Sequence, residues 1–515
     1  MAILPEHLLG LLEPAAYPHA VRGVELVQTH ISWVLLTGEY AYKIKRPVCY
    51  AFLDMREPQR RFELCHEELR LNRRFTTALY LDVCPIVRRG GKARMGGDGP
   101  VLEHAVQMRQ FPGEDELDRL LEAQRAEPAE LRAFGGALAD IHAMLPPAAH
   151  DTKWGSGSVV CAAIESNLDQ AAALEKERHA TQRVNALRPA LLSGLHALQP
   201  WMIERRANGF VRECHGDLHC GNVVRWEGAL HAFDCLEFDP ALRWMDVAQE
   251  VAFLMADLTA RGGATHAHAF LSGYLARGGD YAACRGLTLF MAHCALVRAK
   301  VMALAADQRP TGGIGFAQFA DTAARLLTPP RPLLVVMMGL SGSGKSWLAA
   351  RLAPLLNAIH LQSDVERRRL AGMEPGQRSG SGVQADLYAP EATDRVYAHL
   401  AHCAQEMLSA GWSVIVDATF AGRDRRAQMR ELATRLGVPL HFIDCRAPEQ
   451  VLRQRVSARA ATGTDASEAD VAVLDWQLHH TEPVQPDEGL TMVPVDTAGE
   501  ITPAAIAALA RRCSG

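Results

Sequence analysis

The chain has 515 residues, which is too long for one hydrophobic core, so its length predicts two or three domains. Its 48% apolar and 22% charged residues are typical of a globular protein, and its formal net charge of −5 argues against a surface built for nucleic acid or for an anionic membrane. The N-terminal stretch MAILPEHLLGLLEP has neither the basic start nor the long apolar run of a signal peptide, and the cysteines include no CxxC pair. We therefore expect a cytoplasmic protein with reduced thiols and no membrane segment.

The first part of the chain predicts strands followed by helices. Residues 23–47 place β-branched and aromatic residues around a Gly-Glu turn, which is typical of a β-hairpin. A charged helix with a spaced apolar face is predicted at 58–75, and two further strands are predicted at 82–89 and 101–111. From about residue 115 onward the pattern is mostly helical. A small β-rich lobe should therefore precede a larger helical lobe.

Three boundaries follow from these patterns. We predict an α+β bilobal domain with a small lobe at about residues 1–110, a helical large lobe at about 111–327 and a hinge at 108–114. The proline-rich stretch LLTPPRPLL ends the last helical segment, and we place a linker at 328–332. In 333–515 the apolar strands LLVVMM, AIHLQ, SVIVDA, LHFIDC and LTMVPV alternate with helix-like segments. That alternation predicts an α/β domain with a parallel sheet and helices on both faces.

Residues 213–224, ECHGDLHCGNVV, allow two interpretations. The two cysteines and two histidines suggest a zinc site, but a structural zinc site usually takes a second ligand pair farther along the chain, and no second cluster follows. Asp217 and Asn222 lie five residues apart, as in the kinase pattern H-x-D-x-x-x-x-N. In that chemistry the aspartate deprotonates the attacking hydroxyl and the asparagine holds a metal ion, so the stretch predicts a catalytic loop.

The segment after this loop supplies a second predicted metal ligand. VVRWEGALHAFD predicts a strand, a turn and a second strand that ends at Asp234, where a carboxylate can hold Mg²⁺ against the phosphates. The combination of HGDLHxGN and a later aspartate resembles the aminoglycoside phosphotransferase-like branch of the protein-kinase fold, over roughly residues 20–327. The resemblance implies that Asp217 is the catalytic base and that Asn222 and Asp234 are metal ligands. It also implies a structural role for Asp246 before a helix.

The same resemblance implies that the small lobe supplies a lysine to the phosphates and a helix glutamate to hold that lysine. YAYKIKRP offers Lys43 and Lys45, which alternate onto one face of a strand. We prefer Lys43, because A-x-K is the usual strand pattern, but the choice between the two stays open. Glu68 shares a helical face with apolar residues and is preferred to Glu67, although a solvated face of Glu and Arg side chains is the alternative. No G-x-G-x-x-G loop precedes Lys43.

Residues 339–346, GLSGSGKS, match the pattern G-x-x-x-x-G-K-[ST] between a predicted strand and a predicted helix. The glycines let the backbone curl so that its N–H groups point at phosphate oxygens, and the helix N-terminus adds partial positive charge. Lys345 is expected to reach the terminal phosphates and Ser346 to ligate Mg²⁺. The predicted nucleotide-binding residues are Gly339, Leu340, Ser341, Gly342, Ser343, Gly344, Lys345 and Ser346.

Four further residues are candidates for the same site. Asp417 ends a predicted strand, where it can hold Mg²⁺, although turn chemistry also favours aspartate there. Asp364 follows the second strand and is expected either to accept the proton of a substrate hydroxyl or to cap the next helix. Arg455 and Arg459 share a helical face in 451–470, before a Gly/Thr/Ser stretch, which predicts a lid over the transferring phosphate or a plain surface helix.

The C-terminal part resembles small P-loop kinases of the gluconate and shikimate kinase type, and it is also similar to zeta-toxin-like and polynucleotide kinase domains. Together, the two parts resemble bacterial proteins described as bifunctional aminoglycoside phosphotransferase-like and P-loop ATP-binding proteins. This resemblance implies ATP and Mg²⁺ as cofactors.

The leading hypothesis is a phosphotransferase with two nucleotide sites that moves the γ-phosphoryl group of ATP onto a hydroxyl of a small molecule. One alternative is a regulatory ATP-binding protein in which the kinase-like half is a sensing module and the P-loop half is an ATPase switch. A second is a polynucleotide-end kinase, against which the acidic net charge and the lack of a basic–aromatic stripe both argue. The acceptor and the oligomeric state stay open at this point.

Overall fold

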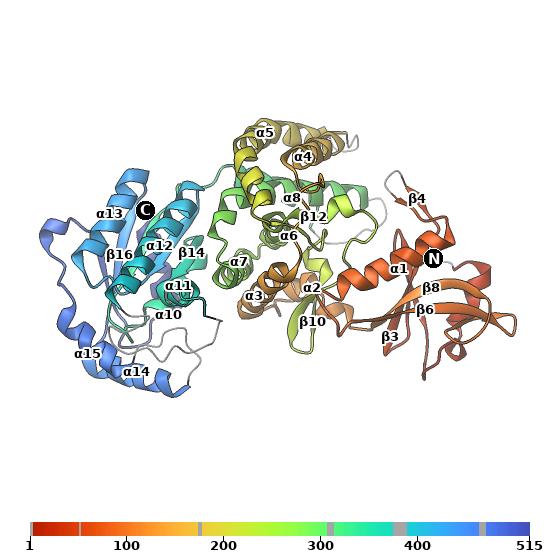
Figure 1. The fold of residues 1–515 in the computed structure, drawn as a ribbon, viewed down its shortest axis with the longest axis horizontal. Helices are drawn as coiled ribbons and strands as arrows, with labels where there is room; N and C mark the ends of the chain where they lie inside the picture. Colours follow the sequence, from red (N-terminus) through yellow and green to blue (C-terminus); the bar gives the residue numbers. More distant parts are fainter. Residues whose placement is uncertain are drawn as a thin grey trace.

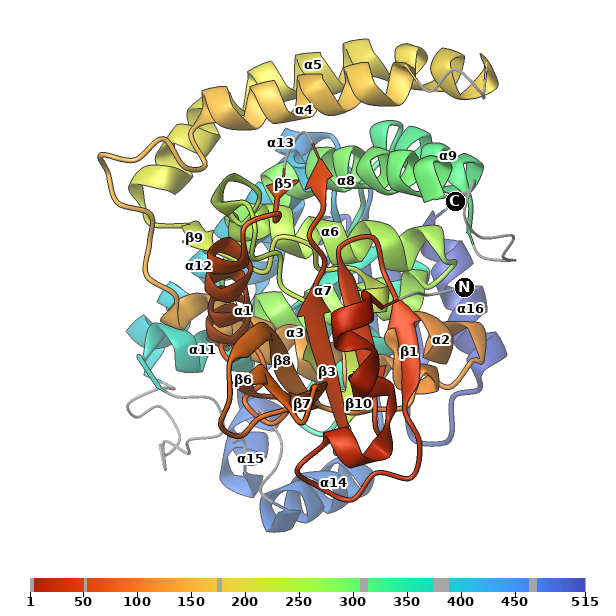
Figure 2. The same cartoon turned by 90° about the vertical axis from the view of Figure 1, so that its right-hand side faces the viewer.

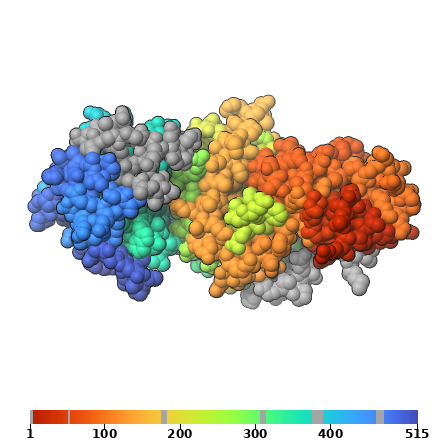
Figure 3. Space-filling model, turned by 90° about the horizontal axis from the view of Figure 1, so that it is seen from below, coloured from red at the N-terminus to blue at the C-terminus, as the bar shows by residue number. Residues whose placement is uncertain are grey.

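The computed structural model describes residues 4–50, 53–173, 178–305, 314–373, 389–462 and 470–514. Three parts follow one another along the long axis of the protein (Figure 1). A lobe with a sheet lies at one end, a helical lobe occupies the middle and an α/β part lies at the other end, in an order that is also visible on the surface (Figure 3). The predicted bilobal α+β domain followed by an α/β domain is confirmed.

The small lobe is built on an antiparallel sheet whose described strands run in the order β1-β2-β3-β8-β6-β7. Side chains alternate between its two faces. Tyr42 and Ile44 face a cluster with the N-terminal 3₁₀ helix η1, whereas Ala41 faces a cluster with helix α1. Lys43 and Lys45 share the α1 side. The elements are η1 (Glu6–Leu12), β1 (Glu25–Gln28), β2 (Ser32–Leu36), β3 (Tyr40–Lys45), β4 (Cys49–Tyr50), β5 (Leu53–Asp54), α1 (Pro58–Asn72), β6 (Tyr80–Arg89), β7 (Lys92–Met95) and β8 (Val101–Arg109).

The large lobe surrounds helix α6, an apolar helix that is buried on most of its surface and packs against α7, α8 and α9. Helices α4 and α5 lie side by side along one edge of the lobe (Figure 2). The helices are α2 (Leu117–Glu122), α3 (Pro128–Met144), α4 (Gly157–Ala172), α5 (Arg178–Ala207), α6 (Val247–Ala260), α7 (Ala264–Gly278), α8 (Cys284–Ala305) and α9 (Phe316–Leu327). The short strands are β9 (Val211–Glu213), β10 (Val223–Trp226), β11 (Ala229–Ala232) and β12 (Trp244–Asp246).

One segment of the described chain, Tyr281–Leu304 around α8, is long and apolar enough to cross a membrane. Of its apolar window, 56% is buried inside the protein, where α8 packs against α6 and α9. Burial of this extent is what a core helix of a globular lobe shows, so length and composition alone do not make it a membrane span.

The α/β part contains a parallel sheet in the order β14-β15-β13-β16-β17. Val336 and Val414 pack into the cluster that holds α12 and α13, while Val335 and Ile415 face the cluster with α10 and α16 on the other side. Helices therefore cover both faces, as predicted. The strands are β13 (Leu334–Met338), β14 (Ala358–Gln362), β15 (Ser413–Asp417), β16 (Leu440–Arg446) and β17 (Met492–Asp496). The helices are α10 (Lys345–Leu355), α11 (Ser363–Leu370), α12 (Pro390–Ser409), α13 (Arg423–Leu436), α14 (Glu449–Thr462), α15 (Val471–His480) and α16 (Pro503–Ser514).

The large lobe and the α/β part share a buried contact. Helix α7 contacts α10 and β14, and α8 contacts α12. The hydroxyl of Tyr281 donates a hydrogen bond to Glu366 Oε1 at 2.7 Å, and the indole Nε1 of Trp412 donates to the carbonyl oxygen of Cys284 at 3.1 Å. One cluster of buried apolar side chains includes members from both parts, so the core continues across the predicted linker at 328–332.

Candidate active sites

The loop between β9 and β10 brings Asp217 and Asn222 together. Asn222 Nδ2 donates to the carbonyl oxygen of Asp217 at 2.9 Å and lies 3.3 Å from its Oδ2. The loop is not helical until the short 3₁₀ turn Cys220–Asn222, and Gly216 adopts a φ of 89°, a left-handed value that favours glycine. The prediction of a loop at this position is therefore confirmed. The side-chain amide of Asn222 and the carboxylate of Asp217 point to the same side of this loop.

The carboxylate of Asp217 is ready to accept a proton. Its side chain is 39% exposed, and His219 Nε2 lies 3.6 Å from Oδ2. Burial would raise the pKa of this carboxyl, but the neighbouring His219 holds the pKa below its ordinary value. Asp217 is therefore ionised at neutral pH.

His215 fixes the loop to the following hairpin. Burial lowers the pKa of His215, so the ring is neutral and has one donor and one acceptor nitrogen. The contacts match that state, because Nε2 donates to the carbonyl oxygen of Phe233 at 2.8 Å and Nδ1 accepts from the backbone N–H of Asp217 at 3.4 Å. The ring thus joins the residue before Asp234 to the loop that carries Asp217.

Two acidic side chains of α6, which were not predicted from the sequence, accept backbone hydrogen bonds from the loop that carries Asp217. Glu250 Oε1 accepts the backbone N–H groups of His215 and Gly216 at 2.5 and 2.9 Å, and Asp257 Oδ2 accepts the N–H of Cys220 at 2.9 Å. Both carboxylates are buried. The available signal was two acids seven residues apart within the otherwise apolar run VAQEVAFLMAD, because an acid on a buried helix face needs a partner.

Asp234 lies two residues beyond the end of β11, so the predicted strand is shorter than expected. Its φ of 62° is unusual for a residue other than glycine, and the hydroxyl of Tyr80 accepts its backbone N–H at 3.0 Å. The carboxylate is 44% exposed and contacts Lys43. Burial would raise the pKa of Asp234, but the Lys43 ammonium outweighs this effect and lowers it, and the charge of Asp217 acts on the same group.

Both candidate lysines of β3 contact Glu68, one at each oxygen. Lys43 Nζ lies 2.8 Å from Glu68 Oε1 and also contacts Asp234, whereas Lys45 contacts Glu68 Oε2 and Glu237. Glu67 pairs instead with Arg70 of the same helix and with the buried Arg243 of the large lobe. Lys43 therefore links Glu68 to Asp234 in the cleft, while Lys45 has a fully buried side chain and links the helix to the segment after Asp234.

The zinc interpretation of 213–224 finds no support in the described residues. There, the cluster of potential ligands that includes this stretch combines Cys214 with His142 and Glu250. Both nitrogens of His142 are engaged, by Tyr274 at 2.9 Å and by Glu250 at 2.8 Å. Glu250 uses its other oxygen on the loop N–H groups, so these contacts already explain the cluster.

In the α/β part, residues 339–346 form a loop between β13 and α10. Three positions of this loop have backbone conformations that favour glycine. Gly339, Gly342 and Gly344 have φ values of 132°, 81° and 80°. A Cβ at Gly339 would lie 2.5 Å from the carbonyl oxygen of Cys445, and one at Gly342 would lie 2.8 Å from that of Leu452. The chain is thus curled tightly, as the phosphate-binding pattern predicts. Lys345 Nζ donates to the carbonyl oxygen of Leu340 at 2.9 Å.

The predicted acidic partners of this loop surround Lys345. Burial lowers the pKa of the Lys345 amine, and the charges of Asp417 and Asp364 act on it in the opposite direction. Asp417 is buried at the end of β15, where His360 Nε2 lies 3.0 Å from Oδ2, and a hydrogen bond with Ser346 further lowers its pKa. Burial alone would raise that pKa. The sequence missed His360, although a histidine in the apolar strand AIHLQ was the available signal.

The two arginines of α14 have different surroundings. Arg455 donates to the carbonyl oxygens of Gly342 at 3.3 Å and of Thr497 at 2.6 Å, so it contacts the backbone of the curled loop. The charge of Arg459 lowers the pKa of Lys345 and thus acts within the site. The predicted lid role of both residues stays a prediction, and much of the Gly/Thr/Ser stretch that follows lies outside the described residues.

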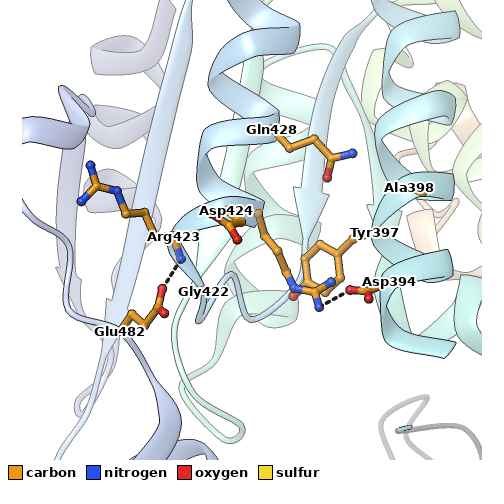
Figure 4. A pocket seen from close by; sticks show the side chains of 9 residues that line it. Asp394, Tyr397, Ala398, Gly422, Arg423, Asp424, Gln428 and Glu482 are labelled. Atoms are coloured by element: carbon orange, nitrogen blue, oxygen red, sulfur yellow. Dashed lines mark hydrogen bonds and ion pairs between the residues drawn. The ribbon is translucent and has the colours of Figure 1, made fainter. Parts of the chain in front are cut away.

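A polar pocket of about 320 Å³ opens next to the loop that follows β15 (Figure 4). Arg425 lies 2.7 Å from Asp394, with its guanidinium 4.1 Å from the centre of the Tyr397 ring. The pocket is at the carboxyl edge of the parallel sheet, where ligands of such sheets bind. Its lining residues are Asp394, Tyr397, Ala398, Gly422, Arg423, Asp424, Arg425, Gln428 and Glu482.

Two family models match the chain. Residues 39–287 match the phosphotransferase enzyme family, and residues 334–484 match a family described as AAA domain. Among curated proteins, uncharacterized protein Rv2004c of Mycobacterium tuberculosis is 28% identical over 476 residues, which cover 89% of this chain and 91% of the relative. The match therefore extends over both parts of this chain.

Solved structures with partial similarity to this chain include two kinases. An amicoumacin kinase in complex with AMP-PNP, Ca²⁺ and Ami is 14% identical, covers 59% of this chain and 88% of its own, and has a TM-score of 0.36. The APS kinase CysC of Mycobacterium tuberculosis, in complex with AMPPNP and APS, is 22% identical, covers 36% of this chain and 96% of its own, and has a TM-score of 0.25.

Proposed function

We propose, since the N-terminal part is a kinase-like phosphotransferase domain and the C-terminal part a P-loop kinase-like domain, that the protein is an ATP- and Mg²⁺-dependent phosphotransferase with two nucleotide sites. Each site would transfer a γ-phosphoryl group to a hydroxyl of a small molecule. The carrying observation is that two sets of contacts, Asn222 with Asp217 and Lys43 with Glu68 and Asp234, meet at one place. The ring of His215 joins them, because it contacts the backbone of Asp217 and that of Phe233, the residue before Asp234.

In the first site, Asp217 would accept the proton of the attacking hydroxyl. The hydroxyl oxygen forms a bond to the γ-phosphorus while the bond to the β–γ bridging oxygen breaks, and ADP leaves with that oxygen. Lys43 would move from Asp234 to the nucleotide phosphates while Glu68 keeps it oriented. Its present partners support this role, because it is the lysine of β3 that touches both Glu68 and Asp234.

In the second site, the curled backbone of 339–346 would hold the phosphates, with Lys345 at the terminal one. Asp364 would accept the proton of the acceptor hydroxyl, and Arg455 and Arg459 would stabilise the transferring group. The contacts of Lys345 with the carbonyl oxygen of Leu340 and of Arg455 with that of Gly342 support this assignment, because both cations lie at the curled loop. The charges of Asp364 and Arg459 also act on the pKa of Lys345.

Both sites have donor sets that fit Mg²⁺, which prefers carboxylate, amide and hydroxyl oxygens. Asn222 and Asp234 would hold it in the first site, and Ser346 and Asp417 in the second. In the first site the buried cluster has two ammonium groups against three carboxylates, an excess of negative charge that favours a cation. When bound, Mg²⁺ would neutralise developing charge on the phosphates.

The polar pocket beside β15 supports a small hydroxyl-bearing acceptor for the second site. Its charged and amide groups suit hydrogen bonds to a polar molecule better than contacts with an apolar one. Reduced cysteines throughout the described chain, without a disulfide, fit the cytoplasmic location that we propose.

The test is ATP turnover by the full chain and by the variants Asp217→Ala, Lys345→Ala and the double variant, together with a metabolite extract searched for products heavier by one phosphate. We expect each single variant to retain the activity of the other site, the double variant to lose both, and the affected site to slow by about 10²–10⁴-fold.

Two results would contradict the proposal. If Asp217→Ala turns over ATP like the wild type while Lys345→Ala is inactive, the first part is a sensing module and the protein a regulatory ATPase. If products appear only on polynucleotide ends, the acceptor assignment is wrong.

A further inference from the structure

A glutamine far from the phosphate-binding motif contacts the motif's backbone. Ser341, the third residue of the curled loop, donates its backbone N–H to Oε1 of Gln477 at 2.8 Å. Gln477 lies on α15, which is 136 residues away in sequence, and its side chain is 9% exposed. Neither the loop motif nor the function proposed above accounts for this contact.

The contact acts on one particular peptide group. The carbonyl oxygen of Leu340 accepts a hydrogen bond from Lys345 Nζ at 2.9 Å, and the N–H of the same peptide unit, which belongs to Ser341, donates to Gln477. Because a peptide group is planar, fixing its N–H also fixes the direction of its carbonyl. Gln477 therefore determines where the carbonyl that holds Lys345 points.

Helix α15 is itself anchored to this loop. The side chain of Leu340 packs into an apolar cluster with Leu452 and Val456 of α14 and Leu474 of α15. The N–H of Glu482, just past α15, donates to the carbonyl oxygen of Ala421 in the loop after β15 at 2.9 Å. The backbone of α15 on both sides of Gln477 is therefore fixed to the loops of this site.

An amide suits this place better than a carboxylate does. It accepts the N–H of Ser341 without placing a negative charge beside the polyphosphate, and its second end is an N–H₂ donor. Among the described contacts the accepting end is the one in use. Because this donor belongs to the same amide as the oxygen that accepts the Ser341 N–H, it lies beside the loop that is expected to hold the phosphates.

We propose that Gln477 is a positioning and specificity residue of the P-loop site: it fixes the Leu340–Ser341 peptide and presents its amide to the terminal phosphate of the nucleotide. The inference rests on the proposed nucleotide-binding function of this site. It makes Gln477 a residue that distinguishes a nucleoside triphosphate from a diphosphate.

The test compares the binding of Mg·AMP-PNP and Mg·ADP by calorimetry, using the full chain in a Lys43→Met/Asp234→Ala background that removes the proposed phosphate-binding lysine and one proposed metal ligand of the first site. Gln477→Glu keeps an acceptor for Ser341 but adds a charge and removes the donor, whereas Gln477→Met removes both ends at similar length. We expect Gln477→Glu to weaken AMP-PNP at least tenfold and Gln477→Met to weaken it less, with ADP changed by less than threefold in both. Gln450→Glu, an exposed position on α14, controls for the added charge.

Two results would overturn the inference. Equal weakening of AMP-PNP and ADP would mean that Gln477 only stabilises the fold, and unchanged binding of both would mean that its contact has no influence on the site. Lys345→Ala in the same background checks the underlying function separately: if AMP-PNP still binds to it, the P-loop is not the nucleotide site, and the failure belongs to the proposed function rather than to Gln477.

Discussion

Lys43 and Lys45 stand two residues apart on one strand and touch the same glutamate, yet their surroundings give them different tasks. Lys43 also contacts Asp234, whose carboxylate is 44% exposed, so it can exchange that partner for a phosphate. Lys45 is fully buried between Glu68 and Glu237. A buried ion pair that loses one member leaves an uncompensated charge, which costs about 3–5 kcal/mol.

We therefore expect Lys43→Met to reduce first-site turnover by at least about 100-fold with a small loss of stability, and Lys45→Met to lower the free energy of unfolding by about 3–5 kcal/mol. Turnover in a Lys345→Ala background and denaturant unfolding measure the two effects, with the exposed Lys153→Met as control. The opposite pattern would make Lys45 the phosphate ligand.

At the scale of elements, α6 acts as the base of the first site. Asp246 caps its N-terminus, accepting the N–H of Ala248 at 2.8 Å, which is the structural role that the family resemblance implied. One turn later Glu250 accepts two N–H groups of the catalytic loop, and two turns after that Asp257 accepts a third. Contacts from one helix therefore fix the position and the orientation of the loop that carries Asp217.

Glu250→Gln should lower first-site turnover by about 10- to 100-fold and leave the KM for ATP nearly unchanged, because the loop shifts while the nucleotide contacts remain.

His142 and the loop N–H groups outweigh burial and lower the pKa of Glu250 below its ordinary 4.5. Its contribution to stability is therefore complete above pH 4.5 and is lost as the pH falls through the lower folded value. Acid unfolding should become less steep in the variant, whereas the exposed Glu204→Gln should match the wild type. An unchanged turnover of Glu250→Gln would contradict the proposal that α6 positions the loop that carries Asp217.

The sequence was sufficient where the signal was local. The strands of the parallel sheet follow from runs of apolar residues, the curled loop from GLSGSGKS, and the pair Asp217 and Asn222 from its spacing. In the small lobe, the short strand β7 was not predicted. The sequence was insufficient where a contact joins distant segments. Nothing near Gln477 indicates Ser341, and the sharing of Glu68 by two lysines depends on the angle between β3 and α1. Such contacts arise from packing, which pattern and propensity do not encode.

At the scale of the whole molecule, the contact between the large lobe and the α/β part holds the helix that carries Asp364. Glu366 of α11 is fully buried, accepts the Tyr281 hydroxyl and pairs with Arg369 at 2.9 Å. Arg369 in turn donates to the carbonyl oxygen of Arg277 in the large lobe at 3.1 Å. The position of α11 is therefore set as much by the large lobe as by its own sheet.

A shared core predicts that the two parts unfold together, so differential scanning calorimetry should record one cooperative transition for the full chain. Tyr281→Phe removes a hydrogen bond to a buried carboxylate and should lower the free energy of unfolding by about 1.5–3 kcal/mol. Tyr50→Phe, whose hydroxyl makes an exposed bond of 3.3 Å, should have little effect. Two separate transitions in the wild type would show that the contact does not couple the parts.

During synthesis on the ribosome, the two surfaces of this contact are made one after the other. Residues up to 327 emerge before the α/β part exists, so the apolar side chains of α7 and α8 that later cover α10, α12 and β14 stay in water until the rest of the chain arrives. Uncovered apolar surface of a nascent lobe is a site for aggregation and for chaperone binding. A chain interrupted between the two parts would thus keep exposed apolar surface on the large lobe, which gives a physical reason for joining the two parts in one polypeptide.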